Sequence, residues 1–221
     1  VVLEIDMDDP ELQTKMLKGM FMTEGKTLRD FVSEDEYRAI DSLFIKNIGV
    51  SVKTSETIKP FFLAASLYPN MIDCPMQSFE SELMKVAQEQ GEEIKGLETL
   101  EEQIQVFEAI PYQDQIDDLL KMAKDNLATD KANFAKMLSV YKDENITAML
   151  EMMDDDSDSS IAKHQDKLLV NRNKNWISKI VYYAKAQATF FGVGAGHLAG
   201  DNGVIHLLRA EGYTVTAVRS E

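Results

Sequence analysis

The strongest chemical signal in the chain is a histidine that follows a run of glycines. Residues 192–200 read GVGAGHLAG and come directly after the apolar pair Phe190 and Phe191. Glycines after a strand let the backbone turn tightly and approach a ligand closely. Open α/β sheets bind their ligands at the carboxyl ends of the strands, and histidine is the commonest metal ligand. His197 is therefore the first candidate for chemistry.

Two other interpretations of this turn have to be weighed. A dinucleotide-binding turn needs Gly-x-Gly-x-x-Gly, and the frame that begins at Gly192 places His197 where the third glycine belongs, which disfavours nucleotide binding. A histidine that only hydrogen-bonds the turn is the structural alternative. The residues alone leave the choice between a ligand and a structural histidine open.

Glu4 is the second candidate, because it lies inside the apolar run of residues 1–7 (VVLEIDM). That run is predicted to be a strand, and Asp6 would then point to the same face. A buried carboxylate without a partner costs several kcal/mol. A metal ion, an arginine or backbone N–H groups would each satisfy Glu4, and so would the capping of a neighbouring loop.

Two further segments carry polar residues next to predicted helix starts. Glu98 lies in the acidic segment LETLEEQ, residues 97–103. Arg172 and Asn173 lie just ahead of a predicted helix that contains Trp176. An arginine can pair a carboxylate through two hydrogen bonds, although the sequence by itself favours an ordinary helix start here. The chain has no His-Glu-x-x-His, Cys-x-x-Cys or Gly-x-Ser-x-Gly motif, and its one cysteine, Cys74, cannot form an intrachain disulfide.

Strand patterns occur at the two ends of the chain, with a long helical stretch between them. Strands are predicted at residues 1–7, 188–193 and 213–218, with a helix at 201–211, and helices from about residue 10 to 185. The last strand–turn–helix–strand segment, residues 188–218, predicts parallel pairing. We therefore expect an α/β (α+β) fold, formed by a small, partly parallel sheet that a mostly helical middle region covers.

The helical middle shows start signals and apolar faces. Capping boxes are predicted where Ser33 precedes Glu36 and where Thr99 precedes Glu102. Helices are also expected at residues 57–68 and 76–90, and an acidic loop at 154–160. The apolar faces, which we interpret as core, comprise Tyr37, Ile40, Phe44 and Ile48; Leu100, Ile104 and Phe107; Ile116, Leu119, Leu120, Ala123 and Leu127; and Ile146, Met149, Leu150 and Met153.

Composition restricts the class of protein. The 221 residues suit one larger domain or two small ones, and we expect a single domain. With 38 acidic against 23 basic residues, the formal net charge is −15. Such a charge repels phosphate backbones, which disfavours nucleic acid and anionic membrane surfaces as partners. The sequence contains no apolar run long enough to span a membrane.

Four segments together resemble the TraB/PrgY/GumN family, which is related to the Tiki metalloproteases. They are residues 2–9 (VLEIDMDD), 96–103 (GLETLEEQ), 171–177 (NRNKNWI) and 191–218, and the resemblance extends over nearly the whole chain. It implies an α/β fold in which two Gly-x-x-His motifs converge on one divalent metal ion, Zn²⁺, Mn²⁺ or Co²⁺. The implied activity is metal-dependent peptide hydrolysis. Some relatives are thought to sequester peptide signals, so a non-catalytic peptide-binding protein is the alternative.

The resemblance also implies roles for residues. Gly194 to His197 matches the second Gly-x-x-His motif, which makes His197 a metal ligand. Glu4 matches the family acid and would be a ligand or the general base. Glu98, Arg172 and Asn173 match supporting positions without an assigned role.

No segment of this chain corresponds to the family's first Gly-x-x-His motif, which precedes the strand that contains the family acid. Because residues 1–7 already resemble a strand, we expect that motif to lie ahead of Val1, and the chain to be N-terminally incomplete and inactive by itself. A catalytic metal generally takes about three protein ligands. An unpaired sheet edge favours a homodimer, which light scattering would test. The resemblance suggests a peptide or protein substrate and a location outside the cytoplasm.

Overall fold

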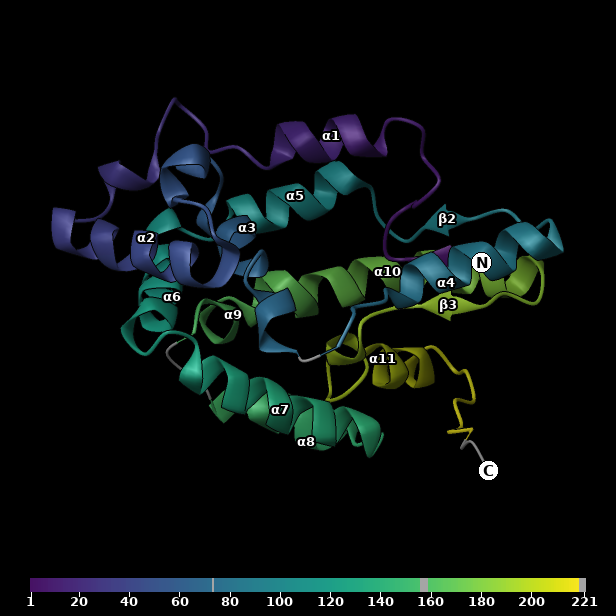
Figure 1. Cartoon of the computed structure of the whole chain (residues 1–221). Helices are drawn as coiled ribbons and strands as arrows, with labels where there is room; N and C mark the ends of the chain where they lie inside the picture. Colours follow the sequence, from purple (N-terminus) through teal and green to yellow (C-terminus); the bar gives the residue numbers. More distant parts are fainter. Residues whose placement is uncertain (73, 156–158, 219–221) are drawn as a thin grey trace.

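Three short parallel strands lie at the centre of the part of the molecule that contains the candidate residues. The computed structural model describes residues 1–72, 74–155 and 159–218 (Figure 1). The strands are β1 (Val2–Leu3), β2 (Lys95–Gly96) and β3 (Phe191–Gly192), in the order β2-β1-β3. Val2 pairs with both Lys95 and Phe191. The strand at the start of the chain is therefore the middle one, and long helical crossovers lead to both neighbours.

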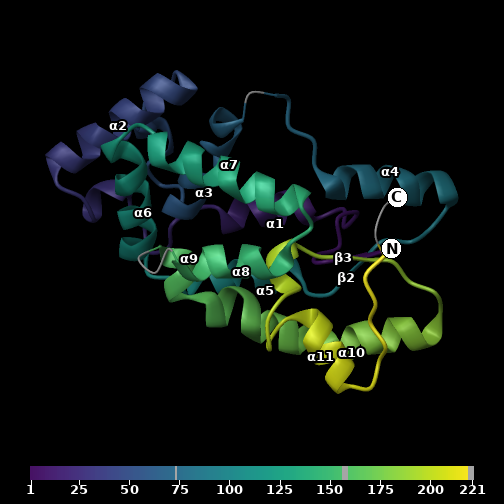
Figure 2. The ribbon, with the colours of Figure 1, turned by 90° about the horizontal axis from the view of Figure 1, so that it is seen from below.

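The two faces of this sheet are covered by different helices (Figure 2). Side chains alternate between the faces of a strand, and Val2 and Leu3 accordingly belong to different apolar clusters. Val2 packs with Trp176 of α10 (Asn171–Ala186) and Val204 of α11 (Val204–Ala210). Leu3 packs with Ala87 of α4 (Phe79–Gln90). The result is an α/β arrangement of three layers, which confirms the predicted fold class.

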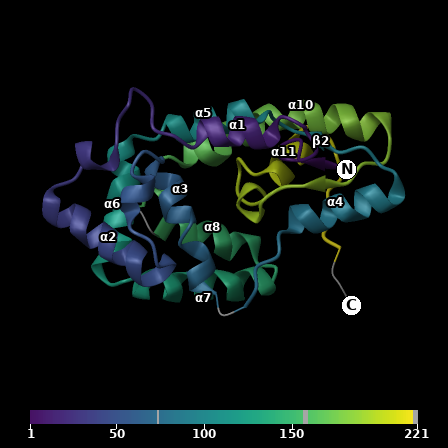
Figure 3. The same cartoon turned by 45° about the horizontal axis from the view of Figure 1, so that its top comes forward.

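A second core lies away from the sheet, in a region that we call the helical lobe (Figure 3). It is formed by α2 (Glu34–Ile48), α3 (Pro60–Ala65), α6 (Tyr112–Lys124) and the short 3₁₀ turns Leu28–Asp30 and Val52–Ser55. Its buried side chains are almost all apolar, namely Leu28, Tyr37, Ile40, Leu43, Phe44, Val52, Leu63, Leu67, Ile116, Leu119, Met122 and Leu127. These side chains form the apolar face of each amphipathic helix, and the faces are buried against one another.

The remaining helices connect the lobe to the sheet. Helix α1 (Leu12–Gly19) lies against α5 (Leu100–Glu108), whose Ile104 side chain fills the space beside Gly19. Helices α7 (Ala128–Lys142) and α8 (Ile146–Asp155) pack together, and α8 contacts the 3₁₀ turn Ala195–His197. The chain also forms the 3₁₀ turn Tyr68–Met71, the short helix α9 (Ser160–Lys163) and the π-helical turn Asp166–Val170, which leads directly into α10.

Both predicted capping boxes are confirmed. The Glu36 carboxylate accepts from Ser33 N at 2.8 Å, and Ser33 Oγ accepts from Glu36 N at 3.3 Å. At the second box, Glu102 accepts from Thr99 N at 2.7 Å while Thr99 Oγ1 accepts from Glu102 N at 3.1 Å. Each pair satisfies N–H groups that a helix start leaves free. The second box fixes the start of α5 directly beyond Glu98.

The predicted sheet was wrong in one strand. Residues 213–218 do not form a strand, because alternating β-branched residues need a neighbouring strand to pair with. The Val215 carbonyl instead accepts from Arg209 Nη2 at 2.7 Å, and Val218 is 92% exposed. The third strand is β2, where a Cβ on Gly96 would lie 2.7 Å from the backbone of Asp6. This close approach requires glycine, which carries no strand signal.

Several boundaries also differ from the predictions. The strands at residues 1–7 and 188–193 shrink to two residues each, and the helices at 57–68 and 76–90 begin later, at Pro60 and Phe79. Ile48 is exposed rather than buried, because α2 ends there, before Gly49 with a φ of 81°. Within the predicted loop at 154–160, α8 continues to Asp155 and α9 begins at Ser160, and residues 156–158 lie outside the described residues. None of the helices in the described part of the chain has the length and apolar character that a membrane span requires.

Candidate functional site

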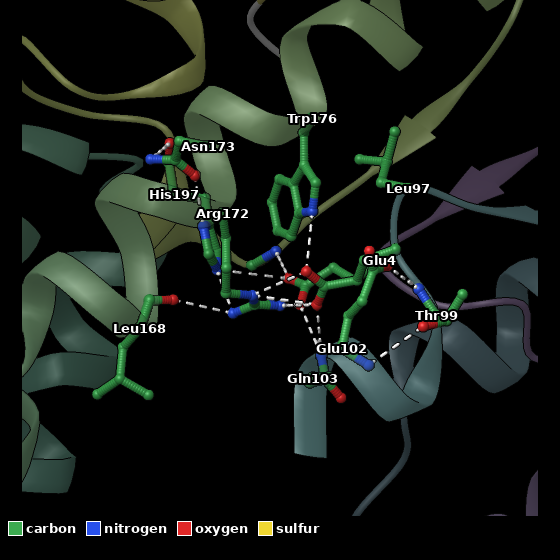
Figure 4. Close-up of polar contacts among 12 residues, drawn as sticks. Glu4, Leu97, Thr99, Glu102, Gln103, Leu168, Arg172, Asn173, Trp176 and His197 are labelled. Atoms are coloured by element: carbon green, nitrogen blue, oxygen red, sulfur yellow. Dashed lines mark hydrogen bonds and ion pairs between the residues drawn. The ribbon is translucent and has the colours of Figure 1, made fainter. Parts of the chain in front are cut away.

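The candidate residues meet where the three strands end. Glu4 follows β1, Glu98 follows β2 and His197 follows β3, while Arg172 and Asn173 lie in the first turn of α10. Figure 4 shows Glu4, Arg172 and His197 directed toward one another, with Asn173 beside His197. Because all three strands are parallel, their carboxyl ends lie at the same edge of the sheet, the position where open α/β sheets bind ligands.

Arg172 is the centre of this cluster. Its Nε and Nη2 atoms donate to Glu98 Oε1 at 3.0 and 2.6 Å, and Nη2 also donates to Glu4 Oε2 at 2.7 Å. Its Nη1 atom donates to the Leu168 carbonyl at 3.0 Å and to His197 Nε2 at 3.1 Å. A guanidinium has five N–H bonds, and each has an acceptor here.

The two carboxylates that surround Arg172 keep its charge in place. Burial by itself lowers the pKa of Arg172, but the hydrogen bonds and charges of Glu98 and Glu4 outweigh burial, so the net shift is upward. Glu98 is only 8% exposed and also accepts from Trp176 Nε1 at 3.0 Å and Gln103 Nε2 at 3.2 Å. A buried carboxylate needs such donors as well as a counter-charge.

His197 is held in one tautomer by its neighbours. The Asn173 Nδ2 group donates to two backbone carbonyls, those of Asn202 at 2.8 Å and His197 at 3.3 Å. The Asn173 Oδ1 atom therefore faces the ring and accepts from His197 Nδ1 at 2.6 Å. With the proton on Nδ1, the Nε2 lone pair is the acceptor for Arg172. In metal sites, a hydrogen bond to the other ring nitrogen orients a ligating histidine in the same way.

The imidazole is neutral at ordinary pH. His197 is 5% exposed, and burial is the main cause that lowers its pKa from 6.5 to about 4. The nearby Glu4 carboxylate raises the pKa, whereas the Arg172 cation lowers it. A low pKa keeps a lone pair on the ring, which is the form that binds metal ions.

Glu4 and His197 lie next to each other, with Glu4 Oε1 and His197 Nε2 3.8 Å apart. The Gly194 N–H donates to Glu4 Oε1 at 2.8 Å, so the glycine turn that positions the histidine also anchors the acid. A Cβ on Gly194 would lie 3.3 Å from the same oxygen, and the turn therefore favours glycine. On the other side, Gln103 Nε2 approaches Glu4 Oε2 at 3.4 Å.

These side chains fit part of a metal-ligand set. Two ligands bound at about 2.1 Å around a tetrahedral ion lie roughly 3.4 Å apart, close to the 3.8 Å between Glu4 Oε1 and His197 Nε2. However, the residues that the structure describes contain no group of three or more His, Cys, Asp or Glu side chains that could hold an ion. Arg172 also occupies the Nε2 lone pair. The set is therefore incomplete among these residues.

The structure brings together all six residues that the sequence singled out: Glu4, Glu98, Arg172, Asn173, Gly194 and His197. Arg172 is more than part of an ordinary helix start, because it links the other charged groups. Asp6 does not join Glu4 as predicted: the chain leaves β1 after Leu3, and the Asp6 carboxylate accepts from Asp8 N at 3.3 Å.

Sequence reasoning missed two members of the cluster. Trp176 was assigned only to a helix, yet its indole N–H binds Glu98 and its ring lies 4.5 Å from the His197 ring, centre to centre. Gln103 contacts both carboxylates. The sequence signal that could have identified Gln103 was its position at the end of the LETLEEQ segment. The free Cys74 is exposed and takes no part in the cluster.

Comparison with known proteins identifies the family of the chain. The model of the TraB/PrgY/gumN family matches residues 1–217, which is nearly the whole chain. Neither a curated protein nor a solved structure gives a significant match. The family match includes all three strand ends and the first turn of α10. The chain therefore belongs to the TraB/PrgY/gumN family.

Proposed function

We propose that this protein is a metal-dependent peptide hydrolase in which the chain supplies Glu4 and His197 to the reacting centre. The observation that carries the proposal is the 3.8 Å approach of Glu4 Oε1 to His197 Nε2 at the carboxyl ends of neighbouring parallel strands. A carboxylate and a neutral imidazole at such a spacing are common ligands of Zn²⁺, and of Mn²⁺ or Co²⁺. A further ligand has to come from outside the described residues.

The chain's own residues prepare this centre. Asn173 keeps the proton of His197 on Nδ1, which leaves the Nε2 lone pair for a ligand role. Gly194 and Arg172 each hold one oxygen of Glu4, so this carboxylate is positioned to bind an ion or to accept a proton from water. A bound divalent ion would polarise the scissile carbonyl and lower the pKa of water.

Glu98 and Arg172 act as positioning residues. Glu98 fixes the guanidinium through two of its nitrogens, and the guanidinium in turn contacts Glu4 and His197. Because Arg172 Nη1 uses the Nε2 lone pair, a metal ion can bind His197 only after that hydrogen bond breaks. Arg172 and a metal ion therefore compete for the same atom.

The second candidate function is peptide binding without hydrolysis. It is favoured by the complete pairing of Arg172, whose five N–H groups all have acceptors among the chain's own atoms. A polar network satisfied in this way holds its own geometry. Such a protein would retain a peptide in the presence of chelator.

Metal content and peptide cleavage distinguish these candidates. We would purify the protein and its His197→Ala variant without chelator and measure Zn, Mn and Co by mass spectrometry, together with cleavage of a peptide library. The hydrolase proposal expects near-stoichiometric metal and cleavage, both lost in His197→Ala. His206→Ala, which alters an exposed histidine of α11, should leave both unchanged.

Two results would count against the hydrolase. One is an unchanged metal content in a His197→Ala variant that still folds, as judged by its circular dichroism. The other is metal-free wild-type protein that retains peptides without cutting them, which would favour the binding protein.

We also propose, from the family, a location outside the cytoplasm. We further propose that two copies of the chain form a homodimer through the outer edge of β2 or β3, and that residues 1–221 form a single domain.

A further inference from the structure

A groove of about 690 Å³ runs beside the candidate site, between α5 and α10. One wall is formed by the π-helical turn and the exposed face of α10, the other by Leu97, Glu98 and α5. Arg172 lines the groove as well as the site. Figure 4 shows it between the His197 side of the cluster and the Leu97–Gln103 side. The groove therefore meets the site at Arg172 and Glu98, the two residues that hold Glu4 and His197 in place or contact them through the guanidinium.

The charge of this groove is opposite to that of the molecule. The whole chain carries −15, yet the groove is lined by four cations, namely Lys167, Arg172, Lys174 and Lys179, against two carboxylates. Glu98 is already paired with Arg172, and Glu102 accepts from Thr99 N at the capping box. The three lysines therefore give the groove an excess of positive charge.

In the part of the chain that the structure describes, these lysines have no carboxylate partner. Lys179 Nζ donates to the Leu97 carbonyl at 2.6 Å, and Lys167 Nζ donates to the Ala109 carbonyl at 2.8 Å. Within the described residues, Lys174 is exposed and makes neither a hydrogen bond nor an ion pair. A lysine has three N–H donors, so each ammonium keeps at least two for a ligand. Both neutral carbonyls lie on the opposite wall, which holds the two ammonium groups across the groove.

The other lining groups suit a peptide backbone. Gln105, Asn171, Asn175 and Ser178 line the same groove, and carboxamides and hydroxyls both donate and accept hydrogen bonds. Lys167 and Lys179 are twelve residues apart, which corresponds to about 18 Å along a helix. An extended peptide covers that length with about five or six residues. A long nucleic acid is disfavoured by the negative charge of the rest of the chain.

We propose that the groove between α5 and α10 binds an extended peptide segment rich in Asp or Glu, through Lys167, Lys174 and Lys179. This assignment deepens the proposed function by naming the substrate class. It does not depend on hydrolysis, because the lysines and carboxamides bind the peptide whether or not a metal is present. Charged groups at such a rim steer the partner and select its sequence.

The test measures binding of a rhodamine-labelled octapeptide of alternating Glu and Ala by fluorescence anisotropy, with chelator present. A counterpart with Gln in place of Glu is the neutral probe. We expect the Glu peptide to bind and the Gln peptide to bind at least about tenfold more weakly, which corresponds to about 1.4 kcal/mol. The double variant Lys174→Glu/Lys179→Glu should lose a similar factor.

The matched control is the double variant Lys46→Glu/Lys53→Glu, which changes net charge equally at two exposed lysines of the helical lobe. It should leave the peptide affinity within about twofold. An equal loss in both double variants would overturn the proposal, because the attraction would then come from overall charge. Equal affinity for the Glu and Gln peptides would overturn it too, as would displacement by inorganic phosphate at the same concentration as by unlabelled Glu peptide.

The outcome separates this inference from the hydrolase proposal. If the protein holds no metal and cuts nothing, the groove still predicts selective binding of the Glu peptide. If the protein cuts neutral peptides as well as acidic ones and Lys174→Glu/Lys179→Glu has no effect, the hydrolase stands and the groove assignment fails.

Discussion

The helical lobe and the site cluster are both buried, but opposite kinds of contact hold them together. In the lobe, Ile40, Leu119 and Ile116 are completely buried among other apolar side chains. In the site, Glu98, Arg172 and His197 are 8%, 7% and 5% exposed and are joined by directed hydrogen bonds and ion pairs. Apolar burial is non-directional and roughly proportional to area, whereas a buried charge depends on specific partners.

This difference teaches that the two regions tolerate change differently. In the lobe, a lost methyl group removes a share of the burial and leaves the rest intact. In the site, removing one group leaves the others buried without a partner, so a single loss has a disproportionate cost. Three predictions follow from this contrast, and in each of them the lobe or an exposed residue serves as the reference.

The largest effect is expected from Arg172→Met. This substitution keeps the bulk of the side chain but leaves Glu98, and in part Glu4, without their counter-charge, and we expect a loss of about 3–5 kcal/mol of unfolding free energy. Urea denaturation measures it. The control Arg38→Met removes an arginine whose side chain is 69% exposed and should cost less than about 1 kcal/mol. Equal losses of unfolding free energy in Arg172→Met and Arg38→Met would contradict the special dependence of the site on its partners.

Adding a second substitution should change stability in opposite directions in the two regions. Glu98→Gln added to Arg172→Met removes the unpaired charge and keeps an oxygen for Trp176 Nε1, so the double variant should be more stable than Arg172→Met alone. In the lobe, Ile40→Ala and Leu119→Ala should each cost about 2–5 kcal/mol, and the double variant should be less stable than either single one.

Double-mutant cycles by urea denaturation measure both couplings. A lower stability for Glu98→Gln/Arg172→Met than for Arg172→Met would show that the site behaves like the lobe.

A smaller effect should appear as a dependence of stability on pH to which the site contributes through His197. The unfolded His197 has a pKa near 6.5, and burial lowers the folded value to about 4. Between these values the unfolded state binds more protons, so stability rises with pH through this window and is fully present above about 6.5. The contribution is on the order of 3 kcal/mol.

Thermal or urea unfolding of chelator-treated protein at several pH values between 4 and 7 measures this contribution. His197→Gln should lose that part of the slope, and Leu119→Ala should keep it. Asp6, whose pKa is raised to about 6 mainly by burial, contributes with the opposite sign but is common to all three proteins. An identical slope in wild type and His197→Gln would contradict the burial of a neutral histidine.

The sequence was most informative where a local rule fixes the structure. The Ser33 and Thr99 capping boxes depend only on residues three apart, and both are present. The glycine turn before His197 is likewise local, and the structure places its histidine at a strand end. Apolar spacing also gave the helices of the lobe, apart from their boundaries. The family resemblance contributed the choice of Glu98 and Asn173, which local patterns alone did not favour.

What the sequence did not predict depends on partners far along the chain. β2 consists of Lys95 and Gly96, and only its pairing with Val2 and Leu3 makes it a strand. Residues 213–218 have the opposite character, with strong strand composition but no pairing. The role of Arg172 depends on residues 4, 98 and 197, which no window around position 172 contains.

The order of the strands in the sheet, β2-β1-β3, differs from their order along the chain, and this difference has a consequence for biosynthesis. A ribosome makes Glu4 before Glu98, then Arg172, and then β3 with His197. The acids therefore lack their cation until Arg172 has been made, and the middle strand lacks its second neighbour until β3 has been made. A nascent chain stalled before Arg172 would expose the acids and one unpaired edge of β1, which is a form that chaperones recognise.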